Sequence, residues 1–236
     1  MNTGKLYLIP NIIADSTQDE VIPPHVRKTL EGIQYFLAED VRTARRYLSS
    51  LKIYESIESL HFEVLNKETA GDELKSLMEP AMTGQAVGVI SESGCPGIAD
   101  PGALAVKFAH EHSIQVIPLV GPSSIFLALM ASGLNGQHFA FHGYLPIESK
   151  EASQAVKTFE KESKSKNQTQ VFIETPYRNN NLMNVLLKTL HDDTLLSVAV
   201  EVTGKGESIN TYPVKKWKSI KPSFPKTPAV FLFLAT

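Results

Sequence analysis

The sequence predicts an α/β protein of two domains, for three reasons. In the first half, short apolar segments rich in β-branched residues alternate with segments of helical periodicity, the pattern of a doubly wound, mostly parallel sheet. Beyond Gly121 the apolar segments follow one another more closely, and the turn Gly204-Lys205-Gly206 predicts an antiparallel hairpin and hence a mixed sheet. The length of 236 residues allows two such units. We therefore expect one domain over residues 1–120 and a second over residues 121–236.

In the first domain, strand-like and helix-like segments differ in length and in periodicity. Each strand-like segment is a short, mainly apolar run, whereas each helix-like segment is longer and repeats its apolar residues every three or four positions. Strands are expected at residues 6–9, 35–38, 61–65, 87–91 and 114–119. Helices are expected at residues 24–32, 42–51, 70–82 and 102–112.

The second domain should hold more strands and fewer helices. Strands are expected at residues 139–144, 170–174, 195–202, 208–214 and 230–235, with helices at 125–131 and 149–166. The longer helix is polar, whereas residues 125–130 are apolar all round, more than one buried helix face needs. We therefore expect a homodimer with the apolar helix near its interface.

The composition is that of a soluble globular protein, with 42% hydrophobic and 20% charged residues. The longest apolar runs, such as residues 229–235, are too short to span a membrane. A single cysteine cannot form an internal disulfide, and no Cys/His cluster has the spacing of metal ligands. With no signal-peptide pattern at the start, we expect a cytoplasmic protein without a metal.

The formal net charge of −2 argues against a dedicated duplex binder, which is usually basic. Contacts with RNA would have to come from local basic patches. One candidate is the arginine group Arg42, Arg45 and Arg46. The lysines of residues 161–166 are typical of a solvated helix face, whereas Trp217 among lysines 215–218 suits stacking on a base.

Two loops between a strand and a helix predict a binding cleft. Residues 91–102 follow an apolar strand and form a connection of twelve residues, where two to six are usual. Gly94 and Gly97 allow close approach of the backbone to a ligand. The segment Gly121-Pro122-Ser123-Ser124 repeats the pattern after the next strand. In open α/β sheets, ligands bind at such carboxyl ends of strands.

The same residues carry a family resemblance. Residues 91–102, Ser-Glu-Ser-Gly-Cys-Pro-Gly-Ile-Ala-Asp-Pro-Gly, resemble the Ser-Asp-Ala-Gly-Thr-Pro-x-Ile-Ser-Asp-Pro-Gly segment of the tetrapyrrole methylase family. The closest branch is the ribosomal small-subunit methyltransferase I type, which methylates a ribose 2′-hydroxyl of rRNA. Further segments resemble motifs of that branch in the same order, at residues 37–46, 118–124, 131–134, 141–146, 172–178 and 201–203. The resemblance covers nearly the whole chain, and its motifs are specific in combination.

The resemblance implies two α/β domains with S-adenosylmethionine (SAM) in a cleft between them. Methyl transfer from a sulfonium mainly requires alignment of donor and acceptor and exclusion of water. The implied cofactor-binding residues are Pro10, Glu92, Gly94, Cys95, Ser123, Ser124, Ile173 and Ala229. Two departures stand out: the family's usual Asp is Glu92, and the loop after Pro10 lacks the glycines of the rRNA branch. That loop should therefore differ in shape.

Charged residues at other strand ends are candidates for the chemistry and for the acceptor. The catalytic candidates are Glu174, Tyr177 and Arg178, because a carboxylate or phenol near an acceptor hydroxyl assists its deprotonation. The candidates for substrate binding are Glu39, Asp40, Arg42, Arg45 and Arg46. Cys95 as a nucleophile is disfavoured, since no His or Asn in recognisable context accompanies it.

The resulting hypothesis is a SAM-dependent methyltransferase that modifies a ribose 2′-hydroxyl of small-subunit rRNA. One alternative is a SAM-binding family member with another acceptor, such as a tetrapyrrole, a protein or a small molecule. Another is a SAM-binding protein with little catalytic activity, and a third, outside the family, is a nucleotide-binding α/β protein. The expected partners are rRNA and a second copy of the chain, with no membrane and no metal.

Overall fold

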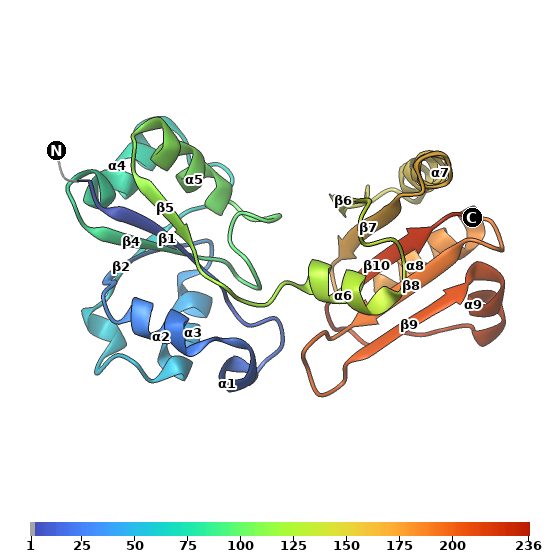
Figure 1. Ribbon diagram of the computed structural model, residues 1–236, viewed down its shortest axis with the longest axis horizontal. Coiled ribbons are helices and arrows are strands. Elements are labelled where there is room, and N and C mark those ends of the chain that lie inside the picture. Colours follow the sequence, from blue (N-terminus) through green and yellow to red (C-terminus); the bar gives the residue numbers. More distant parts are fainter. Residues whose placement is uncertain (1–2) are drawn as a thin grey trace. The chain divides into compact units, whose positions relative to one another are not determined.

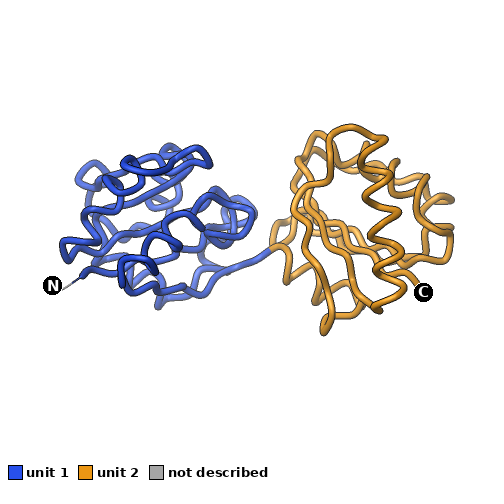
Figure 2. Tube along the Cα trace, turned by 90° about the horizontal axis from the view of Figure 1, so that it is seen from above, with its two compact units in different colours: residues 1–123 blue, residues 124–236 orange. Residues whose placement is uncertain are grey.

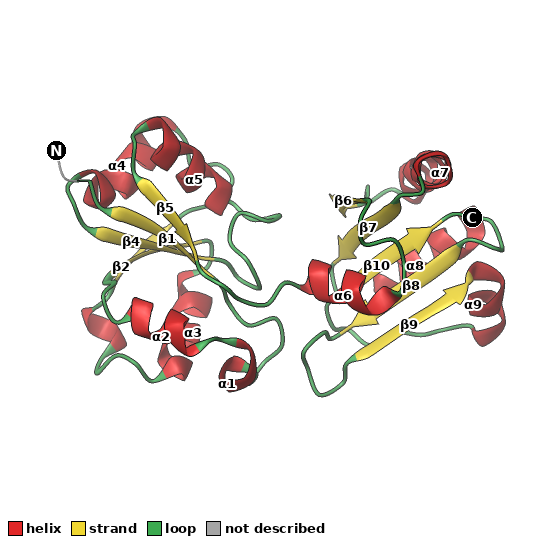
Figure 3. Ribbon diagram, viewed as in Figure 1, coloured by secondary structure: helices red, strands yellow, loops and turns green. Residues whose placement is uncertain are grey.

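A computed structural model describes residues 3–236, which form two compact units. Unit 1 extends to Ser123 and unit 2 begins at Ser124 (Figure 2). Each unit consists of one sheet with helices on both faces (Figures 1 and 3). The predicted fold class, two α/β units with a parallel and a mixed sheet, is confirmed.

The sheet of unit 1 has five strands in the order β3-β2-β4-β1-β5, and every neighbouring pair is parallel. The strands are β1 (Lys5–Ile9), β2 (Tyr35–Ala38), β3 (His61–Val64), β4 (Ala86–Ile90) and β5 (Gln115–Pro118). Because all five run in the same direction, the loops that follow them gather at one edge of the sheet. This edge is called the carboxyl edge of unit 1 below.

Helices cover both faces of this sheet (Figure 1). They are α1 (Gln18–Val21), α2 (Pro24–Leu30), α3 (Val41–Leu51), α4 (Gly71–Met82) and α5 (Gly102–Glu111), with a 3₁₀ turn at Ile57–Ser59. Apolar residues of α2 and α3 pack with Ile9 and Phe36 on one face. Residues of α4 and α5 pack with Leu6 and Val87 on the other. Residues of the inner strands alternate between the two clusters, which is why β2 and β4 are continuous apolar runs.

The sheet of unit 2 has the order β6-β7-β10-β8-β9. Its strands are β6 (Phe139–Tyr144), β7 (Thr169–Glu174), β8 (Leu195–Val200), β9 (Ser208–Pro213) and β10 (Ala229–Leu234). Only β6 and β7 form a parallel pair, whereas β10 runs antiparallel to both β7 and β8. The hairpin expected around Gly204 is confirmed, because β8 and β9 pair antiparallel.

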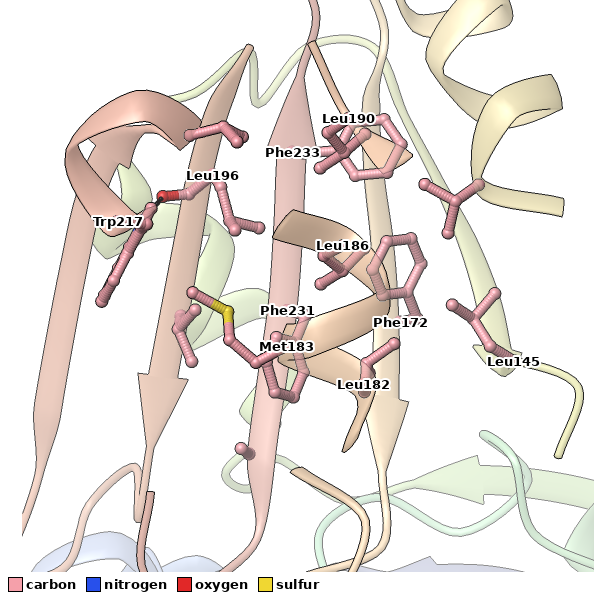
Figure 4. Packing of buried hydrophobic residues seen from close by; sticks show 14 of the residues in the cluster. Leu145, Phe172, Leu182, Met183, Leu186, Leu190, Leu196, Trp217, Phe231 and Phe233 are labelled. Carbon is pink, nitrogen blue, oxygen red and sulfur yellow. Dashed lines mark hydrogen bonds between the residues drawn. The ribbon is translucent and has the colours of Figure 1, made fainter. Parts of the chain in front are cut away.

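The helices of unit 2 are α6 (Ser124–Ser132), α7 (Ser149–Lys166), α8 (Asn179–Thr189) and α9 (Val214–Ile220). Apolar residues of α6 cover one face of the sheet. On the other face, α7, α8 and α9 pack against strand residues that include Phe172, Phe231 and Phe233 (Figure 4). The sequence patterns predicted α6 and α7 but neither α8 nor α9.

Trp217 belongs to this core, so the prediction that it stacks on a base is wrong. The residue is 4% exposed. Its indole Nε1–H donates a 2.8 Å hydrogen bond to the carbonyl of Leu196. The ring packs near Tyr212 and Phe224. Its position three residues after Val214 puts both side chains on the inner side of α9, while the neighbouring lysines face outward.

Candidate functional site

The carboxyl edge of unit 1 brings together the loops that follow β1, β2, β4 and β5. The loop after β4, residues 91–101, is fixed by its own contacts. The Asp100 carboxylate accepts hydrogen bonds from the backbone N–H of Gly97 at 3.0 Å and of Gly102 at 2.8 Å. Gly94, Gly97 and Ala99 have positive φ angles of 69°, 80° and 56°. The loop therefore has a defined shape, and its backbone conformation is one that favours glycine.

Asn11 joins the loop after β1 to the loop after β4, a role the sequence analysis missed. Its side chain is buried, and its Nδ2 donates to the carbonyls of Ser91 at 2.9 Å and Glu92 at 3.1 Å. Its backbone N–H donates to the Gly94 carbonyl at 2.8 Å. The side-chain oxygen accepts from the N–H of Ile12. The side-chain amide and the backbone N–H of Asn11 thus hold the two loops in one arrangement.

Pro10, predicted to contact the cofactor, is buried between two other parts of unit 1. Its carbonyl accepts a 2.7 Å hydrogen bond from the Tyr47 hydroxyl of α3. Burial raises the pKa of that phenol, so Tyr47 remains a donor at neutral pH. On the other side, Gly121 lies so close that a Cβ added there would be 2.1 Å from the Pro10 Cβ. The loop after β1 is therefore held by contacts to α3, to the β4 loop and to the β5 loop.

We expect Gly121→Ala to lower the free energy of unfolding of unit 1 by about 1–3 kcal/mol, the usual cost of overpacking. The new methyl group would lie 2.1 Å from Cβ and 2.4 Å from Cγ of the rigid Pro10 ring, so the backbone would have to move. Urea denaturation measures the change. Gly32→Ala in the same unit is the control, because its nearest neighbouring atom is 3.7 Å away. Equal stability of the two variants would contradict the close packing.

The carboxyl edge carries negative charge. Glu92 is exposed, and its pKa is raised first by partial desolvation and then by the charges of Glu39, Asp40 and Asp100. Asp40 begins α3, where its carboxylate accepts a 2.6 Å hydrogen bond from the Thr43 N–H. This bond is the main reason that the pKa of Asp40 is lowered. Four carboxylates at one edge favour a ligand with positive charge over one with phosphates.

Cys95 lies half-buried in the β4 loop, where its Sγ–H donates to the Pro122 carbonyl of the β5 loop at 3.4 Å. Burial raises the pKa of this thiol, which disfavours the reactive thiolate. Ser123 follows Pro122 directly and is itself half-buried. Gly94 is also near, since a Cβ there would lie 3.5 Å from the Pro122 carbonyl oxygen. The structure thus brings Gly94, Cys95 and Ser123 into one patch.

Arg42, Arg45 and Arg46 are exposed on α3. The Arg42 charge contributes to lowering the pKa of Asp40, which places it near the start of the helix. The Arg45 guanidinium lies 5.2 Å from the ring centroid of Phe62 on β3. Arg45 therefore faces the outer strand β3.

In unit 2, Glu174 ends β7, and its side chain is fully buried. One carboxylate oxygen accepts from the N–H of Thr175 at 2.7 Å and from its hydroxyl at 3.3 Å. The other oxygen lies 2.9 Å from Nη2 of Arg178. The two groups form an ion pair, but their geometry is not that of a hydrogen bond. Both residues line a pocket of about 10 Å³ with Leu145, room for about one water molecule. Glu174 thus fixes the turn that carries Tyr177 and Arg178.

Tyr177, in contrast, is 80% exposed. The ammonium of Lys226 lies over its ring, 5.4 Å from the centroid. Ala229 pairs with Glu174 across the sheet and is buried, whereas Ile173 points to the face that α6 covers and is half-buried. Ser124 is the first residue of α6. The two units thus contain separate groups of the predicted site residues.

Buried polar atoms without a hydrogen-bond partner gather at one end of the unit 2 sheet. Within residues 3–236 they are Glu174 Oε2, Asn179 Oδ1, Thr203 Oγ1 and Thr227 Oγ1. Thr203 also has a positive φ of 70°, which is unusual for a β-branched residue. Glu174 Oε2 is compensated by the Arg178 charge, whereas the other three oxygens mark places where water or a ligand completes the hydrogen bonding.

Two features are absent from the part of the chain that the structure describes. Over residues 3–236, no group of three or more His, Cys, Asp or Glu side chains is placed to hold a metal ion. None of the helices in the same range is long and apolar enough to cross a membrane.

Two solved structures with a similar fold are methyltransferases. The methyltransferase CobJ has a TM-score of 0.62 at 17% identity, over 99% of this chain and 95% of CobJ. The uroporphyrin-III-C-methyltransferase from Thermus thermophilus has a TM-score of 0.56 at 18% identity, over 98% of this chain and 92% of that enzyme. The chain therefore has the tetrapyrrole methylase fold.

Sequence comparison places the chain more narrowly. No protein-family profile matches it. Three proteins named Ribosomal RNA small subunit methyltransferase I are similar to it: 34% identical from Halalkalibacterium halodurans, 30% from Bacillus subtilis and 29% from Escherichia coli O157:H7. The alignments cover 82%, 86% and 89% of this chain but 60%, 65% and 70% of those relatives. The expected resemblance is confirmed: the chain has the tetrapyrrole methylase fold and is similar over most of its length to proteins of the ribosomal RNA small subunit methyltransferase I type.

Proposed function

We propose that the chain is a SAM-dependent methyltransferase whose acceptor is a ribose 2′-hydroxyl of small-subunit rRNA. The observation that carries this proposal is the fixed group of loops at the carboxyl edge of unit 1, in a fold shared with methyltransferases. The relatives named for small-subunit rRNA favour that acceptor. The chain spans 60% of the Halalkalibacterium halodurans relative, and its whole activity is therefore inferred from this shared part.

SAM fits the chemistry of this edge. The sulfonium, ammonium and carboxylate of the cofactor together carry one net positive charge, and the edge carries the carboxylates of Glu39, Asp40, Glu92 and Asp100. A nucleotide ligand would instead bring phosphates to the same negative edge. When bound, the sulfonium supplies an activated methyl group. We propose Pro10, Glu92, Gly94, Cys95 and Ser123 as its contacts in unit 1, and Ser124, Ile173 and Ala229 as its contacts in unit 2.

The protein's own contribution is to position the acceptor and to exclude water. Glu174 is buried and paired, so we propose that it orients Arg178 rather than contacting the acceptor. Tyr177 and Arg178 are then the residues of this turn that meet the substrate. On α3, the exposed arginines Arg42, Arg45 and Arg46 contact RNA beside Glu39, while Asp40 holds the start of the helix.

Two measurements test the proposal. Isothermal titration with S-adenosylhomocysteine (SAH) should give a dissociation constant in the micromolar range, about −8 kcal/mol. Labelled SAM should transfer its methyl group to rRNA from a strain that lacks this protein. SAH binding without transfer to rRNA would favour another acceptor or little activity. Absence of SAH binding would reject the cofactor and favour the nucleotide-binding alternative.

We also propose that the chain acts in the cytoplasm as a homodimer with α6 at the interface. Phe126 and Met130 lie one turn apart on this helix and are 55% and 78% exposed. Burial of such a pair against a second copy would remove apolar surface from water. Sedimentation at micromolar concentration should therefore show a dimer that Met130→Glu converts to a monomer. A monomeric parent protein would contradict the proposal.

A further inference from the structure

We propose that Tyr177 and Lys226 form a platform on which an unpaired base of the RNA acceptor stacks. The inference rests on the proposed function and assigns a specific RNA contact to unit 2. Its starting point is the exposure of Tyr177, which is 80% accessible to solvent. An aromatic ring open to solvent next to a cation is the arrangement with which proteins bind unpaired bases.

The platform is held in place by hydrogen bonds between two loops. Asn179 and Asn180 begin α8, just after Tyr177. Asn179 Nδ2 donates to the Thr227 carbonyl at 2.7 Å, next to Lys226. Asn180 exchanges two hydrogen bonds with the backbone of Phe224, at 3.1 Å and 2.8 Å. The loop that carries Lys226 is therefore tied to the start of the helix that follows Tyr177.

The other side of Tyr177 is fixed by the buried carboxylate of Glu174. That carboxylate holds Thr175 by two hydrogen bonds and Arg178 by an ion pair, so the residues on both sides of Tyr177 are anchored. A side chain that is exposed on an anchored turn loses little conformational freedom when a base stacks on it. This preorganisation distinguishes Tyr177 from an exposed residue on a loose loop.

The charges nearby suit a nucleic-acid backbone. The Arg178 charge is already paired with Glu174. Lys226 forms no ion pair within residues 3–236, and its ammonium lies 5.4 Å from the centroid of the Tyr177 ring. Lys226 is therefore the cation that remains for a phosphate beside the stacked base.

Fluorescence anisotropy with a labelled single-stranded RNA oligonucleotide tests the platform. Tyr177→Ala should weaken binding at least about fivefold, the lower end of base–aromatic stacking. Tyr177→Phe should bind like the parent, because it keeps the ring. Lys226→Ala should reduce the slope of log affinity against log salt by about 0.7, the value for one phosphate on a single strand. Lys161→Ala, an exposed lysine on α7, is the matched control and should leave the slope unchanged.

Several outcomes would overturn the platform. They are RNA affinity of Tyr177→Ala equal to that of the parent, equal loss in Tyr177→Phe, or no RNA binding by the parent. Methyl transfer by Tyr177→Phe separates stacking from proton transfer, since a phenol that takes part in proton transfer cannot be replaced by Phe. SAH titration of the same variants separates this inference from the proposed function. Normal SAH binding and transfer with unchanged RNA affinity would reject the platform alone.

Discussion

Phe231→Ala is expected to lower the free energy of unfolding of unit 2 by about 3–5 kcal/mol. Phe231 lies on β10, the middle strand of the sheet, and is fully buried. Its side chain lies under α8, near Met183 and Phe172 (Figure 4). Truncation would leave a cavity that these neighbours cannot fill without moving strands on both sides. Urea denaturation followed by tryptophan fluorescence reports the change, because Trp217 belongs to the same core.

Ile220→Ala is the control for this variant. Ile220 ends α9 in the same unit and is 47% exposed. Its truncation should change stability by no more than about 0.5 kcal/mol. A loss for Phe231→Ala as small as that for Ile220→Ala would show that the packing around β10 is loose.

The second large effect is expected for Ser123→Tyr, which should abolish SAH binding. Ser123 follows Pro122, whose carbonyl accepts the hydrogen bond from Cys95 of the β4 loop. A tyrosine ring at this position would fill the space above Gly94 and Cys95 that the proposed cofactor needs. In isothermal titration the parent should bind SAH with a micromolar dissociation constant, a binding free energy of about −8 kcal/mol, whereas the variant should give no measurable heat.

Ser49→Tyr serves as the control, because Ser49 is exposed near the end of α3, away from the carboxyl edge. Its SAH affinity should equal that of the parent. Retained binding in Ser123→Tyr would place the cofactor elsewhere in the molecule. Unfolding curves of both variants establish that any lost binding is not a loss of structure.

Sequence patterns were sufficient for most of the fold, but they missed the short helix α1 of unit 1 and the helices α8 and α9 of unit 2. The bounds of β2, β6 and α7 match their predictions, because each segment has a consistent period and clear ends. Helix α8 begins with three asparagines, which have low helix propensity, and is stabilised by Leu182, Met183 and Leu186 in the core. Helix α9 has only Val214 and Trp217 on its buried side. The formation of α8 and α9 therefore depends on tertiary packing more than on local sequence.

Some features of the candidate site could likewise be predicted from the sequence, whereas others could not. A strand followed by a glycine-rich loop is a local pattern, so the positions of Gly94 and Ser123 at strand ends could be predicted. The role of Asn11 depends on the register between β1 and β4, whose partners lie about 80 positions apart in the chain. The burial of Glu174 likewise depends on the placement of α8 above β7. Neither relation leaves a signal in the local sequence.

The position of β1 between β4 and β5 also affects the order of events during synthesis. Lys5 pairs with Ala86 of β4 and with Gln115 of β5, partners that are 81 and 110 residues further along the chain. At about 5–20 residues per second, the ribosome needs roughly 4–16 s to reach the first of them. During that time the apolar strand β1, which later lies between β4 and β5, has neither of its neighbours. Unit 1 is thus a candidate for protection by chaperones while it is being made, since an unpaired apolar strand readily joins another chain.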